Sequence, residues 1–508
     1  MSKLSTSTAA LATAAAVGWI FTHNPLGPAV AMAATGLILH AKFSGGAPKD
    51  AQFGETVRGT QVDSKTKRKQ ARVPVDQITL GGILIPRDNE PQHFLVVGNP
   101  GVGKTVAWLS VMDVARARHQ RAVVYDPTGE FVSHYYRSGQ DVILSPIDAR
   151  SASWSPWGEG QTAFDYENIA RALIPDSAGE NQFWVDAARG VFQSVLAATT
   201  DLSGLIDLVL AQDHEVFQTV IQAQGLIGLC GPPNMLASTR GVAATYVRQL
   251  AYLPPFSGRP FSIRDWVHDE TKDSWLFVTS REDVRKTIRP LLSLWLGLAV
   301  QAVMTLPVNR ERRLWLVLDE LPYLQKLPAV DTALAGGRKY GAACLVGVQT
   351  IPQLREIYGR EAAASLMSYP STRLSMRVGD AETAEFLSKS LGDRHTIRKV
   401  SSESQNSGGG GQSTSEQHSI EAAVLPSEIL ALPDLVGYLR VPNDPIIKKI
   451  KLIRRERGSL AEPYQYRSLA TPPPIPQALL LAGPAGLARA PVAGPDAPDL
   501  DGADLPDS

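Results

Sequence analysis

The sequence predicts an α/β protein with a mostly parallel, doubly wound sheet, an inserted all-α domain and an N-terminal helical hairpin. Short apolar runs that end in polar groups alternate with helical segments, which is typical of parallel strands joined by crossover helices. Residues 163–262 interrupt this alternation with mostly helical periodicity, and the chain begins with a long uncharged stretch. Its 508 residues suffice for roughly two to four domains.

The composition limits the classes of protein to which the chain can belong. Hydrophobic residues are 44% and charged residues 20%, so most of the chain can bury a core. Lys plus Arg and Asp plus Glu each total 50, which excludes a strongly basic coat for nucleic acid but not local basic stripes. Cys230 and Cys344 are the two cysteines, which excludes a disulfide scaffold and fits a reducing compartment. The nine histidines show no metal-binding spacing.

The N-terminal stretch Leu4–Ala41 contains no Asp, Glu, Lys or Arg, and a His-Asn-Pro and a Gly-Pro divide it into two short apolar runs. We expect residues 1–45 to form a transmembrane hairpin, because Lys3, Lys42 and Lys49 would then all lie inside. A cleaved signal peptide and a buried helical pair are the alternatives. The first run is marginal and the second is short for a span of about 20 residues.

A basic linker, residues 46–75, follows this stretch. Within it, Lys65–Arg72 carries five positive charges in eight residues. Such a run beside a membrane anchor binds anionic headgroups, and the alternative is a solvated linker.

A phosphate-binding loop follows the first buried strand. Phe94–Gly98 reads as that strand, and the periodic segment Val106–Ala117 reads as a helix. Glycines let backbone N–H groups encircle phosphate oxygens, and the helix N-terminus adds partial positive charge. Lys104 would reach the β- and γ-phosphates of ATP, and the Thr105 hydroxyl would bind Mg²⁺. The predicted nucleotide-binding residues are Gly98, Asn99, Pro100, Gly101, Val102, Gly103, Lys104 and Thr105.

A second buried strand, Ala122–Tyr125, ends in Asp126-Pro-Thr-Gly-Glu130. The carboxyl ends of parallel strands carry functional groups, which favours a role for Asp126 in the site. The alternative is a turn that the Asp side chain closes with the help of the adjacent Pro and Gly.

A third strand, Arg313–Leu318, ends in two adjacent carboxylates, Asp319 and Glu320. Strand alternation points their side chains in different directions. Asp319 would then hold Mg²⁺ while Glu320 polarises the attacking water.

The next strand, Ala342–Val348, ends in Gln349. An amide beside the carboxylate strand is well placed to sense the γ-phosphate, or it is an ordinary polar strand terminus. Arg338 precedes this strand and is either a surface charge or an arginine that completes a neighbouring subunit's site.

The predicted order of domains follows from these segments. After the hairpin and linker come the first part of the nucleotide-binding domain, the all-α insertion and the second part of that domain. A mobile Gly/Ser-rich loop and a Pro/Ala-rich, acidic and disordered tail are expected as well. The boundaries are 1–45, 46–75, 76–162, 163–262, 263–462 with the loop at 401–415, and 463–508.

Two groups of basic residues are candidates for contact with nucleic acid. Four arginines in or near the insertion are channel-lining candidates, or else solvated helix charges. Lys448–Arg457 holds six positive charges in ten residues, which favours an edge strand protected by charge over a DNA or lipid contact. The four arginines are Arg240, Arg248, Arg259 and Arg264.

The assembled order of motifs over most of residues 75–450 resembles the type IV coupling proteins of bacterial conjugation, of the TraD/TrwB type. One departure from the family's pattern is Thr128, which leaves the role of that loop open. The motifs that carry the resemblance are Gly98–Thr105, Asp126–Glu130, Ser145–Arg150, Trp154–Trp157, Trp275–Pro290, Leu318–Pro322, Gly337–Lys339, Gly347–Gln349 and Leu432–Leu435.

The resemblance implies a hexameric, RecA-like ATPase at the inner membrane, with ATP and Mg²⁺ as substrate and cofactor. It implies as partners DNA, the relaxase and accessory relaxosome proteins, and the type IV secretion channel. Lys104, Glu320 and Gln349 match the family's catalytic positions, Thr105 and Asp319 its Mg²⁺ ligands. Arg338 matches its arginine finger, which acts on the adjacent subunit.

Two other functions stay open at this point. The same motor fold serves protein-effector couplers and chromosomal DNA translocases. A nucleotide-regulated membrane receptor with little turnover is the remaining alternative, and the intact carboxylate pair, Asp319 and Glu320, argues against it.

Overall fold

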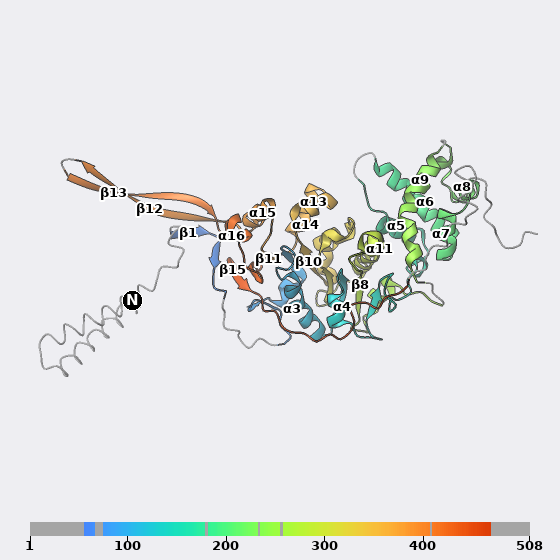
Figure 1. Ribbon diagram of the computed structural model, residues 1–508, viewed down its shortest axis with the longest axis horizontal. Coiled ribbons are helices and arrows are strands. Elements are labelled where there is room, and N and C mark those ends of the chain that lie inside the picture. Colours follow the sequence, from blue (N-terminus) through green and yellow to red (C-terminus); the bar gives the residue numbers. More distant parts are fainter. Residues whose placement is uncertain are drawn as a thin grey trace, which may run out of the picture.

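The computed structural model describes residues 55–66, 75–177, 181–231, 234–254, 258–406 and 409–468 (Figure 1). The predicted N-terminal hairpin, much of the basic linker and the tail beyond residue 468 lie outside the described residues.

A ten-stranded sheet forms the centre of the molecule. Its neighbouring strands are parallel except in the two pairs that β14 makes, with β11 and β15. The predicted, mostly parallel sheet is therefore confirmed. In spatial order the strands are β2 (Gln61–Asp63), β15 (Ile446–Lys451), β14 (Val436–Arg440), β11 (Thr372–Met376), β5 (Phe94–Val97), β10 (Ala342–Val348), β9 (Leu314–Leu318), β6 (Arg121–Asp126), β8 (Trp275–Thr279) and β7 (Val142–Leu144).

The central strands are apolar at every position because both faces of the sheet are covered. In β9, Leu316 and Leu318 belong to one hydrophobic core while Trp315 and Val317 belong to the other. This alternation follows from the period of two in a strand.

The two cores are filled by different helices. On one face lie α3 (Lys104–Ala117) and α4 (Glu130–Tyr135), together with the small hairpin of β3 (Thr79–Leu80) and β4 (Ile83–Leu84). The helices on the other face are α10 (Ile263–His268), α11 (Arg285–Met304), α12 (Pro328–Gly336), α13 (Ile351–Tyr358), α14 (Arg360–Ser368), α15 (Ala381–Leu391) and α16 (Pro426–Leu430).

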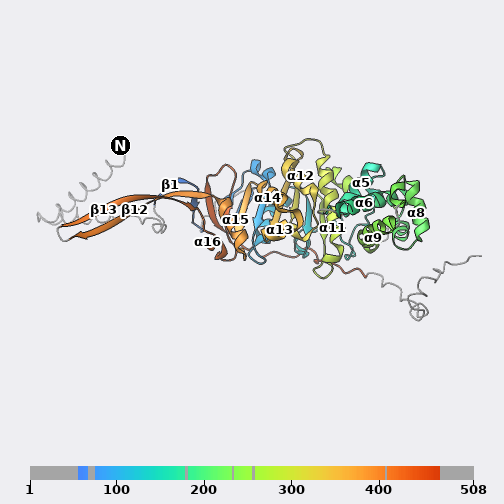
Figure 2. The same cartoon turned by 90° about the horizontal axis from the view of Figure 1, so that it is seen from above.

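A helical region connects β7 and β8, and it lies at one end of the molecule in both views (Figures 1 and 2). These helices are amphipathic, and their buried sides pack into the same hydrophobic core as α11. The domain boundaries proposed from the sequence stay a prediction. The helices are α5 (Ala163–Leu173), α6 (Asn181–Ala198), α7 (Leu202–Leu210), α8 (His214–Ala223) and α9 (Met235–Val247), with 3-10 turns at Ile227–Cys230 and Arg248–Tyr252.

Helix α11 is the one candidate for a membrane span by length and hydropathy within the described residues. Its most apolar window is 78% buried inside the protein. It packs against α5, α10 and α12, so it is a core helix of the folded chain.

A long hairpin of β12 (Asp393–Asn406) and β13 (Gly409–Ala422) projects from the opposite end of the molecule (Figure 1). Strand β1 (Glu55–Gly59) pairs with β12 at its base. The prediction of a loop at 401–415 was wrong for the described residues of that segment, because they pair as strands. The segment lacks apolar residues, so it gives no periodic hydrophobic signal, and its pairing depends on backbone hydrogen bonds.

Two further expectations need correction. The basic strand β15 is not at the edge of the sheet, because β2 pairs with its outer side. The tail does not begin at residue 463, since Gln465 and Arg467 form backbone hydrogen bonds with Ala149 and Ile147. Both contacts join segments far apart in the chain, which local sequence does not predict.

Candidate functional site

The order of strands gathers the predicted site residues at one edge of the sheet. Strand β10 lies between β5 and β9, and Val348 is level with Val97 while Val346 is level with Leu318. The glycine loop follows β5, the carboxylate pair follows β9 and Gln349 follows β10. Because all three strands are parallel, their carboxyl ends meet at the same edge.

The backbone of the glycine loop requires its glycines. Gly101 and Gly103 have φ values of 78° and 113°, a region that favours glycine. A Cβ atom on Gly103 would come within 2.6 Å of Leu435, whereas one on Gly101 would meet nothing within 4 Å. Gly101 therefore faces open space, where a ligand can approach the backbone closely.

Neighbouring segments brace the loop from three sides. The Gly98 amide donates to the Val348 carbonyl at 3.1 Å, and the Asn99 amide donates to that of Arg377 at 2.9 Å. The Leu435 amide donates to the Val102 carbonyl at 2.8 Å. These contacts fix the loop before any ligand binds, which lowers the entropy cost of binding.

Lys104 is the first residue of α3, and its ammonium group is turned onto the loop. Its Nζ donates to the Gly98 carbonyl at 2.8 Å and to that of Asn99 at 3.4 Å. The same atom lies 3.5 Å from Glu320 Oε2. Only 8% of Lys104 is exposed, so its ammonium group is held inside the site. When a nucleotide binds, the ammonium group can exchange these carbonyl partners for phosphate oxygens.

Asp319 is half-buried beside the first turns of α3. The Trp108 indole N–H donates to its Oδ1 at 3.2 Å. Burial raises the pKa of Asp319 to about 6, although the Lys104 charge and the Trp108 hydrogen bond lower it. Gly347 on β10 makes room for this carboxylate, since a Cβ there would lie 3.0 Å from Oδ1.

Glu320 adopts a strained backbone at the centre of the site. Its φ of 69° is rare for a residue other than glycine, asparagine or aspartate. Such strain persists where the surroundings hold it and is common at active sites. Burial raises the pKa of Glu320 to about 7, against the Lys104 charge and the Gln349 amide, which lower it. Its buried Oε1 has no hydrogen-bond partner among the described residues, which fits a carboxylate that orients a water molecule.

Gln349 stands at the end of β10, where the sequence places it. Its Nε2 donates to the Tyr323 hydroxyl at 3.2 Å. The structure thus brings Lys104, Asp319, Glu320 and Gln349 together, and their individual roles stay predictions.

Arg338 does not join this group within the same chain. It lies exposed in a 3-10 turn, Gly337–Tyr340, just before β10 begins. The seven residues of β10 separate it from Gln349 by roughly 20 Å. Arg338 can therefore reach only a nucleotide that is bound to a second copy of the chain.

Asp126 organises a turn beside the site. Its carboxylate accepts hydrogen bonds from the amides of Thr128, Gly129 and Val132 at 3.3, 2.8 and 2.8 Å. These hydrogen bonds form the turn that leads into α4, so the position of Asp126 is explained by its structural role in that turn. Burial raises the pKa of Asp126 to about 6, and the nearby Asp319 raises it further.

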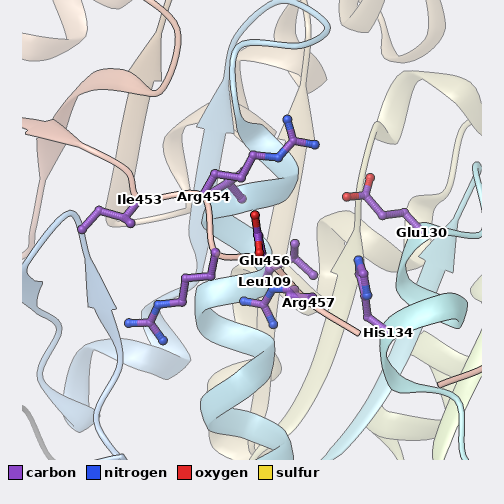
Figure 3. Close-up of a pocket in the computed structure, with 9 residues that line it drawn as sticks. Leu109, Glu130, His134, Ile453, Arg454, Glu456 and Arg457 are labelled. Carbon is purple, nitrogen blue, oxygen red and sulfur yellow. The ribbon is translucent and has the colours of Figure 1, made fainter. Parts of the chain in front are cut away.

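A cavity of about 440 Å³ flanks the start of α3 (Figure 3). Val106 and Leu109 of α3 form one wall, and Glu130 and His134 of α4 form another. The segment 453–457, which follows β15, closes it, and Figure 3 shows Arg454 extending along the helix toward its N-terminal end. Glu130 is close enough to Asp319 to raise the pKa of that carboxyl, so the cavity borders the site.

Three residues that contact the site were missed from the sequence. Trp108 and Tyr323 bond to site residues that lie 211 and 26 positions away in the chain. Arg377 braces the glycine loop through its carbonyl oxygen, which carries no sequence signal. Trp108 and Tyr323 each stand three positions after a motif residue, Thr105 and Glu320, but nothing in either residue type signals the contact.

This loop, the carboxylate pair and the parallel sheet place the chain among the P-loop nucleotide-binding proteins of RecA-like fold. The chain belongs to the type IV secretion coupling proteins: residues 77–453 match the family described as "Type IV secretion-system coupling protein DNA-binding domain". The resemblance stated from the motifs is thereby confirmed.

Relatives and solved structures agree with this assignment. Coupling protein TraD of Escherichia coli (strain K12) is 34% identical over 408 residues, covering 77% of this chain and 57% of TraD. Protein VirD4 of Agrobacterium fabrum is 28% identical over 343 residues, 60% of this chain and 50% of VirD4. This chain therefore spans little more than half the length of the curated relatives that it matches.

The structural matches cover most of the chain. The unbound conjugative coupling protein TrwBdeltaN70 has a TM-score of 0.73 at 30% identity, covering 83% of this chain and 98% of TrwB. TrwB in complex with ADP and Mg²⁺ has a TM-score of 0.72 at 28% identity, covering 83% and 99%.

Proposed function

We propose that this protein is a membrane-anchored ring ATPase that delivers DNA, with its attached relaxase, into a type IV secretion channel. The observation that carries this proposal is the convergence of the glycine loop, Asp319–Glu320 and Gln349 on one edge of a RecA-like sheet in a coupling-protein chain. Related proteins support it: TraD is a coupling protein, and TrwB has been solved with ADP and Mg²⁺ and with an ATP analogue.

The loop and Lys104 would hold the phosphates of ATP. Gly101 leaves the backbone N–H groups accessible, and the α3 N-terminus adds partial positive charge. Thr105 and Asp319 have the oxygen ligands that Mg²⁺ prefers, and the Lys104 ammonium lies close enough to Asp319 to lower the pKa of its carboxyl. Bound Mg²⁺ would offset the negative charge of the phosphates.

Glu320 would orient the attacking water, and its raised pKa suits a group that accepts a proton near neutral pH. Gln349, next to it, would contact the γ-phosphate. The charge that develops on the transferred phosphoryl group would be stabilised by Lys104 and by Arg338 of an adjacent subunit. Since Arg338 lies at the opposite edge of the sheet, this scheme requires a closed ring of copies, for which a hexamer is the expected form.

The cavity beside α3 would receive the nucleoside. Val106 and Leu109 offer an apolar wall for a base, and Arg454 offers a cation near the phosphates. The cavity borders the loop through α3, so a nucleotide held by Lys104 extends into it.

The anchor, the DNA path and the protein partners are also part of the proposal. We propose that residues 1–45 anchor the chain in the inner membrane with the ATPase domain in the cytoplasm. Relaxosome proteins and the secretion channel would be its protein partners, with DNA passing through the ring.

ATP turnover by the full chain, with and without long DNA, tests the proposal. We expect DNA to stimulate turnover and Lys104→Ala to abolish it. Glu320→Gln should keep ATP binding and lower turnover by about 100-fold or more. Oligomeric protein that hydrolyses ATP but ignores DNA would favour a protein-effector coupler, and binding without turnover would favour a nucleotide-regulated receptor. Normal turnover by Glu320→Gln would contradict the assignment of the water-orienting residue.

A further inference from the structure

Tyr323 links the predicted γ-phosphate sensor to the segment that carries the carboxylates. It ends the 3-10 turn Leu321–Tyr323, which begins directly after Glu320. Its hydroxyl accepts a hydrogen bond from Gln349 Nε2 at 3.2 Å. The turn after β9 and the end of β10 are therefore joined by a side-chain contact beside the site.

This contact holds the end of the Gln349 side chain in place. The amide nitrogen donates to the Tyr323 hydroxyl, which can both accept and donate a hydrogen bond. The contact therefore fixes where the amide group lies at the end of β10. Removing the hydroxyl frees the amide to rotate away from this position.

The ring of Tyr323 is itself held in place. The Arg285 guanidinium lies 3.8 Å from the ring centroid, a distance typical of a cation–π contact. Both terminal nitrogens of Arg285 bond to Glu282, at 2.6 and 2.7 Å. Arg285 is the first residue of α11 and only 8% exposed, so the ring rests on a fixed support.

We propose that Tyr323 is a positioning residue for catalysis, whose hydroxyl holds the Gln349 amide at the end of β10, where it would contact the γ-phosphate. This inference rests on the proposed function of the site, because it assigns Tyr323 a role through Gln349. Tyr323 acts through another residue and does not touch the phosphates, so it should govern turnover more than ATP affinity.

Tyr323→Phe in the full chain tests this role, because it removes one oxygen atom and keeps the ring on Arg285. We expect kcat to fall about 3- to 10-fold with KM for ATP nearly unchanged. The matched control is Tyr358→Phe, since the Tyr358 hydroxyl also accepts a hydrogen bond, from the Leu327 amide at 3.3 Å, outside the site. The control should keep the wild-type kcat.

Coupling to Gln349 separates positioning from a general loss of structure. If Tyr323 acts through the amide, Gln349→Ala should lower kcat, and adding Tyr323→Phe should lower it no further. Effects that multiply in the double variant would overturn the proposal, because they would show two independent roles.

The outcomes distinguish this inference from the function on which it rests. Loss of activity in Glu320→Gln and Gln349→Ala with wild-type kcat in Tyr323→Phe would overturn the role of Tyr323 alone. Wild-type turnover in Glu320→Gln would overturn the proposed function, and with it this inference.

Discussion

At the scale of single residues, the site carries an electrostatic cost that can be measured. Burial raises the pKa of Asp319 from 3.8 to about 6, so the folded chain favours the protonated carboxyl. The stability that this preference contributes is present below the unfolded-state pKa of 3.8 and is lost as pH rises through about 6. At neutral pH, the ionised form of Asp319 therefore lowers the stability of the fold, which fits a carboxylate proposed to bind Mg²⁺.

Asp319→Asn should stabilise the protein at neutral pH while abolishing turnover. The amide cannot ionise, and its oxygen can still accept from Trp108, so the gain should reach about 2 kcal/mol near pH 7.5 and vanish near pH 4. The measurement is thermal unfolding of both proteins across this range of pH. Equal melting temperatures at every pH would show that Asp319 is not destabilised by burial.

The residues that the sequence reveals are those whose chemistry is local to a motif. Lys104 and Thr105 stand in a loop of fixed spacing, and Asp319 and Glu320 follow a buried strand. Trp108 and Tyr323 act through contacts between separate elements, and their residue types suit an ordinary core equally well. Composition and spacing hold no information about such pairs.

At the scale of elements, the C-terminal strap, residues 452–467, ties the site to the rest of the sheet. It begins beside the glycine loop, where the Leu452 amide donates to the Leu435 carbonyl at 2.7 Å. It then crosses α4, where Leu460 bonds to the Ser133 carbonyl, and ends beside the loop after β7. The strap closes the cavity beside α3, so its position should affect nucleotide binding.

Arg457 holds the strap on α3. It pairs with Asp113, and its Nη1 lies 3.2 Å from the Tyr135 hydroxyl. Arg457→Met keeps much of the side-chain volume but removes these contacts, so it should cost about 1.5 kcal/mol of stability. It should also weaken ATP binding through the displaced wall of the cavity. Thermal unfolding and nucleotide titration of the full chain are the measurements.

A double variant provides the control for this prediction. Asp113→Asn alone should destabilise the chain, and adding it to Arg457→Met should cost less than the sum of the two changes. Additive effects would mean that the pair does not hold the strap. Unchanged ATP affinity in Arg457→Met would show that the position of the strap does not affect nucleotide binding.

Elements with a hydrophobic period were predictable, and those without it were not. Strands β5, β9 and β10 and helix α3 lie close to where the sequence places them. Residues 401–415 of the β12–β13 hairpin were predicted as a loop because their polar side chains show no hydrophobic period. The inner position of β15 depends on β2, a short strand that pairs across more than 380 residues of sequence.

At the scale of the whole molecule, the sheet separates two functional edges. The glycine loop and the carboxylates lie at the carboxyl ends of the strands, while Arg338 lies before β10 at the other edge. Within one chain, the Arg338 guanidinium is therefore too far from the candidate nucleotide site to contact a nucleotide bound there. A heterologous, ring-closing interface would resolve this separation, because it brings one edge of each copy against the other edge of the next.

Mixing two inactive variants tests this arrangement. Lys104→Ala removes the nucleotide site and keeps the finger, whereas Arg338→Ala keeps the site and removes the finger. Each alone should lose turnover. An equal mixture should recover about a quarter of the wild-type rate, since a quarter of the interfaces then pair an intact site with an intact finger. Wild-type turnover in Arg338→Ala alone, or no recovery in the mixture, would contradict a role for Arg338 across the interface.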